Sequence, residues 1–80
     1  MVTINDVRNA LIVNGNDLAD YLTDPNLEAA VFWDELSMDS LDLEELKSEI
    51  AHQKGVQIPE DVSVNDTVRE FIDRINSVNY

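Results

Sequence analysis

The sequence predicts an all-α fold, a small four-helix bundle with three main helices, one short helix and a long first loop. In three segments the apolar residues recur every three or four positions, and residues that favour helix ends flank these segments. No segment shows the alternation of apolar and polar residues that is typical of a strand of convincing length. Because 80 residues provide for only one core, we expect a single domain over residues 1–80.

The first main helix is expected to start near Ile4. Thr3 and Asp6 resemble a capping box, in which a hydroxyl and a carboxylate satisfy free amides of the first turn. Asn14-Gly15 supplies the C-terminal stop. The residues expected on the buried face of this helix are Ile4, Val7, Ala10 and Leu11.

Residues 16–37 form a long, partly helical connection with a turn at Asp24-Pro25-Asn26. Its large apolar residues are Leu18, Tyr21, Leu22, Leu27, Val31, Phe32 and Leu36. Exposing them together would forfeit about 25 cal/mol per Å² of buried apolar surface. We therefore expect the connection to pack across the helices, with Tyr21, Phe32 and Trp33 as core or rim aromatics.

The second main helix is expected to begin after Asp39, its N-cap, and to end at Lys54-Gly55, a basic last turn followed by a left-handed cap. The residues of its buried stripe are Leu43, Leu46 and Ile50. Leu41 lies roughly 160° from Leu43 on a helical wheel, on the polar face. That face also carries Glu44, Glu45, Ser48 and His52. Packing provides no reason for a leucine there.

The rest of the chain is expected to hold an extended segment, a minor element and a last helix. Val56-Gln57-Ile58-Pro59 is extended because the residue before a proline avoids helical angles. Residues 60–63 form at most a turn or a one-turn helix. The last main helix then runs from Asn65 or Asp66 to Asn76, with Val64 as a candidate hydrophobic staple. Its expected core residues are Val68, Phe71, Ile72 and Ile75.

The charge narrows the classes of partner. Seventeen acidic residues stand against five basic ones, for a formal net charge of -12. Nucleic acids and anionic membranes are bound through clusters of Lys and Arg, so neither is an expected ligand. No apolar run approaches the roughly 20 residues that span a bilayer, and the first residues do not resemble a signal peptide. We therefore expect no membrane insertion, a cytoplasmic location and soluble partners with basic surfaces.

Residues 34–49 concentrate the negative charge, with seven acidic residues and Lys47 as the only base. A solvated helix face is one interpretation. Like charges at helical spacing repel each other, however, and folding does not need them, so a docking surface for a basic partner is the better hypothesis. Ser40 lies in the first turn of the expected helix, where a phosphate group is tolerated. Spacing alone leaves open whether Ser40 is a phosphoester site or a spare capping residue.

Three motifs together resemble the acyl carrier protein family. They are Phe32-Trp33-Asp34-Glu35-Leu36-Ser37-Met38-Asp39-Ser40-Leu41-Asp42, then Glu45-Leu46, and finally Val56-Gln57-Ile58-Pro59. The resemblance extends over nearly the whole chain and centres on Asp39-Ser40-Leu41. It implies a four-helix bundle with a long first loop. It also implies a carrier that does no chemistry itself and is not an enzyme.

In the family the matching serine, here Ser40, is joined by a phosphodiester to 4'-phosphopantetheine, whose thiol holds acyl groups as thioesters. The resemblance implies that Asp39 and Leu41 flank this attachment site and that the helix after it is the recognition helix. The partner-binding residues that it implies are Asp39, Leu41, Asp42, Glu44, Glu45 and Ser48. The implied partners are a phosphopantetheinyl transferase and the acyl-loading and acyl-processing enzymes of fatty-acid or specialised acyl and polyketide biosynthesis. We expect the carrier to be a monomer, with no metal site.

The chain departs from the family pattern on this face. Members commonly have glycine at the position of Ser37 and apolar residues at the positions of Glu44, Lys47 and Ser48. These differences favour a specialised pathway at least as much as standard fatty-acid synthesis. Two alternatives stay open: an aminoacyl or peptidyl carrier, and an unmodified acidic adaptor that binds a basic protein. His52 is the only histidine and has no serine or cysteine at a spacing typical of a hydrolase triad.

Overall fold

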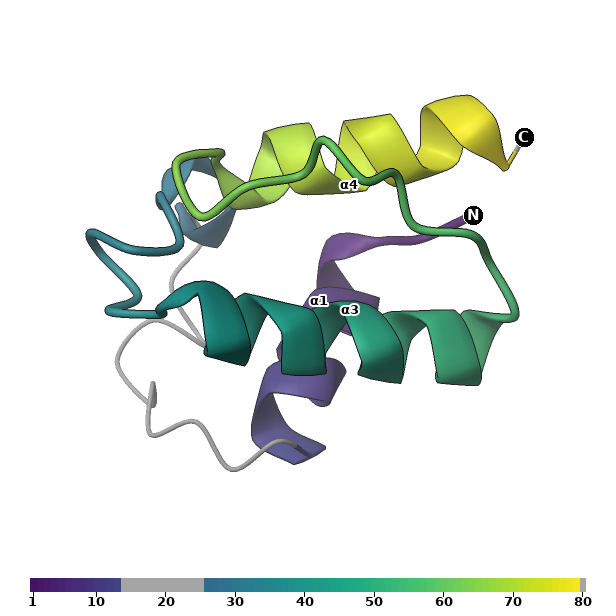
Figure 1. Cartoon of the computed structure of the whole chain (residues 1–80), viewed down its shortest axis with the longest axis horizontal. Coiled ribbons are helices and arrows are strands. Elements are labelled where there is room, and N and C mark those ends of the chain that lie inside the picture. The colour runs from purple at the N-terminus through teal and green to yellow at the C-terminus, as the bar shows by residue number, and fades with distance from the viewer. Residues whose placement is uncertain (14–25, 80) are drawn as a thin grey trace.

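The computed structural model describes residues 1–13 and 26–79 of the chain. In these residues it contains the α-helices α1 (Ile4–Val13), α3 (Ser40–Lys54) and α4 (Val68–Val78) and the short 3-10 helix η1 (Leu27–Ala29). Helices α3 and α4 run in the same direction along the long axis of the molecule, and α1 crosses them (Figure 1). The described residues form no strand, so the all-α class is confirmed.

The predicted fourth helix of the bundle is not confirmed. The described residues contain only the 3-10 turn η1 in addition to the three α-helices. Residues 60–63, for which the sequence predicted at most a turn or a one-turn helix, contain a turn at residues 60 and 61 and no helix. In the residues that follow, side chains bond to nearby backbone amides: Asp66 Oδ2 accepts from Ser63 N at 3.0 Å, and Ser63 Oγ accepts from Asn65 N at 2.9 Å. Such local bonds compete with the backbone bonds of a helix.

The first helix forms as predicted. Thr3 N donates to Asp6 Oδ2 at 2.8 Å, and Asp6 N donates to Thr3 Oγ1 at 3.4 Å, which completes the capping box. Val7, Ala10 and Leu11 are buried, and Ile4 is half-buried against the core. The expected stop at Asn14-Gly15 lies outside the described residues, and α1 ends at Val13.

Helix α3 has both of its predicted ends. Asp39 Oδ1 accepts from Asp42 N at 2.9 Å, and Asp42 Oδ2 accepts from Asp39 N at 3.3 Å. At the other end Gly55 adopts the left-handed conformation, with φ 64°. The predicted stripe of Leu43, Leu46 and Ile50 is buried and packs into the core.

Part of the long connection packs across the helices, as predicted. Its buried residues are Leu27, Ala30, Phe32, Leu36 and Met38. The ring of Phe32 meets that of Phe71 in α4 edge to face, with centroids 5.3 Å apart. An isolated antiparallel bridge between Val31 and Thr67 joins the connection to the start of α4. The other predicted contacts, those of Leu18, Tyr21, Leu22 and the turn at Asp24-Pro25, lie outside the described residues.

Helix α4 begins two or three residues later than predicted. Thr67 is its N-cap, with Oγ1 accepting from Glu70 N at 3.1 Å, whereas the carboxylate of Asp66 serves the preceding turn. Val64 packs against the core but stands three positions before the cap, so it does not occupy the staple position. The four predicted core residues are buried, and the helix extends to Val78.

Two asparagines, Asn76 in α4 and Asn79 directly after it, hold other segments in place. Asn76 pairs with Val2, accepting from its N at 2.8 Å and donating to its O at 3.0 Å. Asn79 pairs in the same way with Gln57, at 2.9 Å and 2.7 Å. Each asparagine side chain thus bonds to both the N and the O of one residue, as the backbone of a neighbouring strand would. In the described part of the chain, no helix has the length and apolar character needed to cross a membrane.

Candidate functional site

Ser40 is the first residue of α3 and is exposed. The capping box before it is made by Asp39 and Asp42, so the cap does not use the Ser40 hydroxyl. Within the described residues this hydroxyl makes no hydrogen bond. The Ser40 hydroxyl therefore takes no part in the cap of α3 and is available to a reactant from solvent.

The loop before Ser40 is folded on itself. Met38 N donates to Phe32 O at 2.8 Å, and Leu36 N donates to Val31 O at 3.4 Å. The side chain of Glu35 accepts from Val31 N at 3.1 Å. These bonds give the segment that leads into α3 a defined conformation.

Ser37 lies in this loop with φ 54°, in the left-handed region. Glycine adopts this conformation without the steric cost that a Cβ atom brings. The backbone here therefore has the geometry that glycine favours, although the residue is serine.

Buried side chains on both sides fix the backbone at Ser40. Met38 is 2% exposed and Leu43 is 3% exposed, and both belong to the core cluster. Ser40 and Leu41 lie between them in sequence, and Leu41 is 66% exposed. The predicted position of Leu41 on the solvent face of α3 is therefore confirmed.

The acidic residues of this region differ in how free their carboxylates are. Glu44 pairs with Lys47 at 2.8 Å, and Glu49 accepts a hydrogen bond from Gln53 at 2.6 Å. Asp39 and Asp42 each use one oxygen in the capping box. Within the described residues, Glu45 forms no ion pair or hydrogen bond. Of the carboxylates in α3 and its N-cap, that of Glu45 is thus the most available to a partner.

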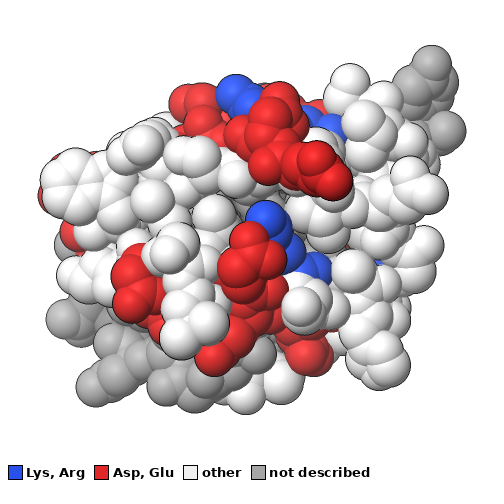
Figure 2. Space-filling model, in the orientation of Figure 1, with Lys and Arg blue, Asp and Glu red and all other residues white. Residues whose placement is uncertain are grey.

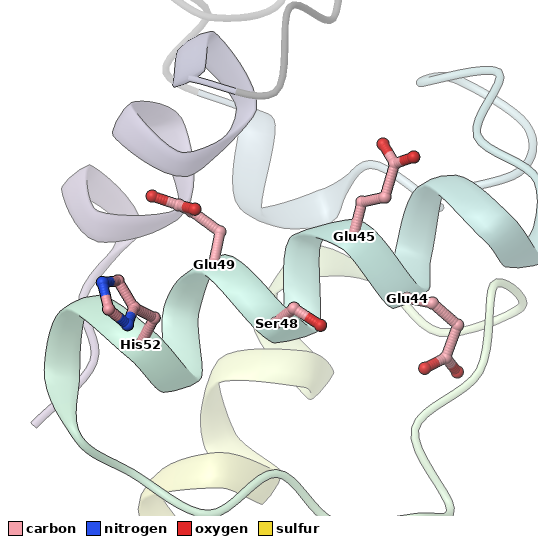
Figure 3. Close-up of a pocket in the computed structure, with 5 residues that line it drawn as sticks. All are labelled: Glu44, Glu45, Ser48, Glu49 and His52. Carbon is pink, nitrogen blue, oxygen red and sulfur yellow. The ribbon is translucent and has the colours of Figure 1, made fainter.

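The exposed face of α3 forms a shallow open depression (Figure 3). Its lining residues are Glu44, Glu45, Ser48, Glu49 and His52. Glu45 and Glu49 point to one side of the helix and Glu44 to the other, with Ser48 between them (Figure 3). All five lining residues belong to α3, so no second element encloses the depression as it would a substrate pocket. The arrangement suits contact with another surface.

Acidic side chains extend beyond α3. Figure 2 shows them gathered over both α3 and α4 on this side of the molecule, with few basic side chains among them. Among the described residues, no group of three or more His, Cys, Asp or Glu side chains converges as metal ligands would.

Trp33 lies at the surface of the loop before Ser40. It was expected in the core or at its rim, but its side chain is 55% exposed, whereas Phe32 is fully buried. Val31 forms an isolated bridge with Thr67, and Phe32 and Trp33 lie in the turn that follows it. The sequence held no pattern that separates the buried ring from the exposed one.

Comparisons of the chain with protein-family models, with curated proteins and with solved structures find no match.

Proposed function

We propose that this chain is an acyl carrier protein with 4'-phosphopantetheine attached to Ser40. The observation that carries the proposal is the exposed Ser40 hydroxyl, which the helix cap does not use, within Asp39-Ser40-Leu41. A serine at the start of a helix can serve as its N-cap. Here Asp39 and Asp42 form the cap, and this leaves the hydroxyl for another role.

The residues around Ser40 fit a phosphodiester. The first amides of α3 and its helix dipole favour negative charge at this end. Asp39 and Asp42 oppose a further anion, but each already directs one oxygen to a backbone amide, and attachment at Ser40 Oγ leaves both bonds intact. When bound, the group supplies a thiol that holds an acyl chain as a thioester, a function that the cysteine-free chain lacks.

The exposed face of α3 is the proposed docking surface, made of Asp39, Leu41, Asp42, Glu44, Glu45 and Ser48. Leu41 is the apolar anchor, because a large exposed side chain buried at the centre of an interface contributes most of its binding energy. Glu45 attracts basic groups, whereas the pairing of Glu44 with Lys47 weakens its pull. The chain is then a substrate of its partners and not itself an enzyme.

The partners have the basic surfaces that this face requires. They are a phosphopantetheinyl transferase and the acyl-loading and acyl-processing enzymes of fatty-acid or specialised acyl and polyketide biosynthesis. The protein acts in the cytoplasm as a monomer, since a net charge of -12 opposes self-association.

An unmodified acidic adaptor is the second candidate function. Leu41 and Glu45 form a contact surface that needs no modification, and this observation favours it. An aminoacyl or peptidyl carrier is a weaker alternative, because the density of acid on α3 is unusual for that group. Only the carriers require the free hydroxyl of Ser40.

Loading of the carrier with its arm tests the proposed function. Incubation with coenzyme A, Mg²⁺ and a broad-specificity phosphopantetheinyl transferase should increase the intact mass by one phosphopantetheine group. Ser40→Ala should abolish the gain. Ser77→Ala, at an exposed serine near the end of α4, should keep it. If a transferase that is active on a known carrier leaves the mass unchanged, the adaptor function replaces the carrier function.

A further inference from the structure

Trp33 is the only tryptophan of the chain, and its side chain is 55% exposed. Tryptophan is on average among the more buried residues, because exposing its large apolar ring to water is unfavourable. The fold does not need the ring, since Phe32, Leu36 and Met38 of the same loop fill the core. An exposed ring of this size points to contact with another molecule.

The backbone of Trp33 is held in place. Its N donates to Val64 O at 3.1 Å, and the neighbouring Phe32 N donates to Asp66 O at 3.3 Å. The bond from Met38 N to Phe32 O closes the loop at its base. Since the loop is already ordered, a partner that binds the indole ring has little conformational entropy to remove.

The loop brings Trp33 close to the modification site. The bond of 2.8 Å between Phe32 O and Met38 N, together with standard backbone dimensions, keeps the α-carbons of Trp33 and Ser40 within about 15 Å. Leu41 follows Ser40 directly. Figure 1 shows the loop at the same end of the molecule as the first turn of α3. A standard interface covers about 800 Å² on each partner, enough to include both exposed side chains.

The charge around the two side chains selects the kind of partner. Asp34 follows Trp33 and is exposed, and Asp39 and Asp42 flank Ser40 and Leu41. A surface that combines exposed apolar side chains with carboxylates complements apolar slots bordered by Lys and Arg. A second copy of this chain carries the same net charge of -12 and is repelled.

We propose that Trp33 is a second apolar anchor, and that partner enzymes bind both the loop before Ser40 and the helix after it. This inference rests on the proposed carrier function and extends its docking surface beyond α3. A single anchor at Leu41 leaves the partner free to rotate about that contact. Two anchors on either side of Ser40 in the sequence remove this freedom, and the second apolar contact adds to the affinity of the complex.

The kinetics of Ser40 loading provide the first test. Trp33→Ala should increase the KM of the transferase for the carrier about fivefold or more, as expected for an interface anchor. The kcat should change less than KM, and Trp33→Phe should restore part of the loss. Val78→Ala is the matched control, because Val78 is also 55% exposed but lies at the far end of α4. Circular dichroism should show that all three variants fold.

A spectroscopic test needs no substitution at Trp33. Chain labelled with 5-fluorotryptophan gives a single fluorine resonance, because Trp33 is the only tryptophan. The Ser40→Ala form is titrated with unlabelled transferase without coenzyme A, so that binding occurs without reaction. The resonance should shift saturably and lose its sensitivity to D₂O. Leu41→Ala should raise the transferase concentration needed for half of the shift.

The outcomes separate this inference from the proposed function. If wild-type chain is loaded but the resonance does not shift and Trp33→Ala behaves like Val78→Ala, the Trp33 anchor is overturned and the carrier function stands. A shift that depends on carrier concentration alone assigns the surface to a second copy and overturns the inference. If the resonance of labelled wild-type chain shifts once Ser40 carries its arm and the transferase has been removed, Trp33 contacts the arm and the inference is overturned. Absence of loading overturns both proposals.

Discussion

The residues around Ser40 have separate structural roles. Asp39 and Asp42 cap α3, Met38 anchors the backbone in the core, and Ser40 is left with a free hydroxyl. Ser37 accepts a backbone conformation that costs a residue with a Cβ atom about 1 kcal/mol. At the residue scale, the structure therefore has one strained position next to a fully capped helix.

A glycine should be favoured over alanine at position 37. Ser37→Gly and Ser37→Ala both remove the hydroxyl, so their difference reports the backbone alone. At an ordinary exposed position alanine is the more stable. At φ 54° we expect the opposite order, with the glycine variant ahead by about 1 kcal/mol in urea unfolding. Equal or reversed stabilities would show that position 37 is not left-handed in solution.

At the scale of elements, α3 has two faces with separate roles. Leu43, Leu46 and Ile50 attach it to the core, and α1 packs against it. The opposite face carries Leu41 and Glu45, which the packing does not use. Substitutions on the two faces should therefore change different measurements.

Leu41→Ala and Leu43→Ala are a matched pair in this helix. Leu43 is 3% exposed, so its truncation should cost about 2 to 5 kcal/mol of stability. Leu41 is 66% exposed, so its truncation should leave the melting temperature almost unchanged. Loading of Ser40 should be slower in Leu41→Ala at low and high salt, and in Glu45→Lys mainly at low salt. Unfolding of Leu41→Ala would contradict the assigned faces.

At the scale of the whole molecule, basic residues join separate segments. Lys54 at the end of α3 pairs with Asp6 in α1 at 3.5 Å, and Arg74 in α4 pairs with Asp61 of the preceding linker at 2.9 Å. Arg69 of α4 pairs with Glu28 in η1 at 3.0 Å. These bases are thereby committed within the chain. The excess of acidic residues remains for contacts with other molecules.

The pair between Asp6 and Lys54 predicts a pH dependence. Burial acts to raise the pKa of Asp6, but hydrogen bonds from Thr3 and the charge of Lys54 outweigh it and lower this pKa below 3.8. A carboxylate whose pKa is lower in the folded state stabilises that state at pH values above its pKa in the unfolded chain. This contribution is lost as the pH falls through the folded pKa. Asp6→Asn should therefore reduce the melting temperature at neutral pH and approach wild type below pH 3.8.

Asp34→Asn is the control for this prediction. It removes the same charge from an exposed carboxylate that forms no ion pair within the described residues. It should change the melting temperature little at any pH. A deficit in Asp6→Asn that persists at low pH would show that the loss comes from packing and not from ionisation.

The sequence by itself determined the features that depend on nearby residues. The caps at Thr3 and Asp39 and the stop at Gly55 are local, so the start of α1 and both ends of α3 were predicted correctly. The helical period also placed Leu41 on the solvent face. A cap or a wheel position is decided within about four residues, and no distant contact overrode these.

Only the tertiary structure decided the features that depend on distant partners. Asn65, Asp66 and Thr67 are all suitable caps, and the bridge from Val31 to Thr67 accompanies the choice of Thr67. The same region holds the backbone of Trp33 through Val64 and so directs its ring to solvent. Contacts between residues far apart in sequence settle these choices, and no local pattern encodes them.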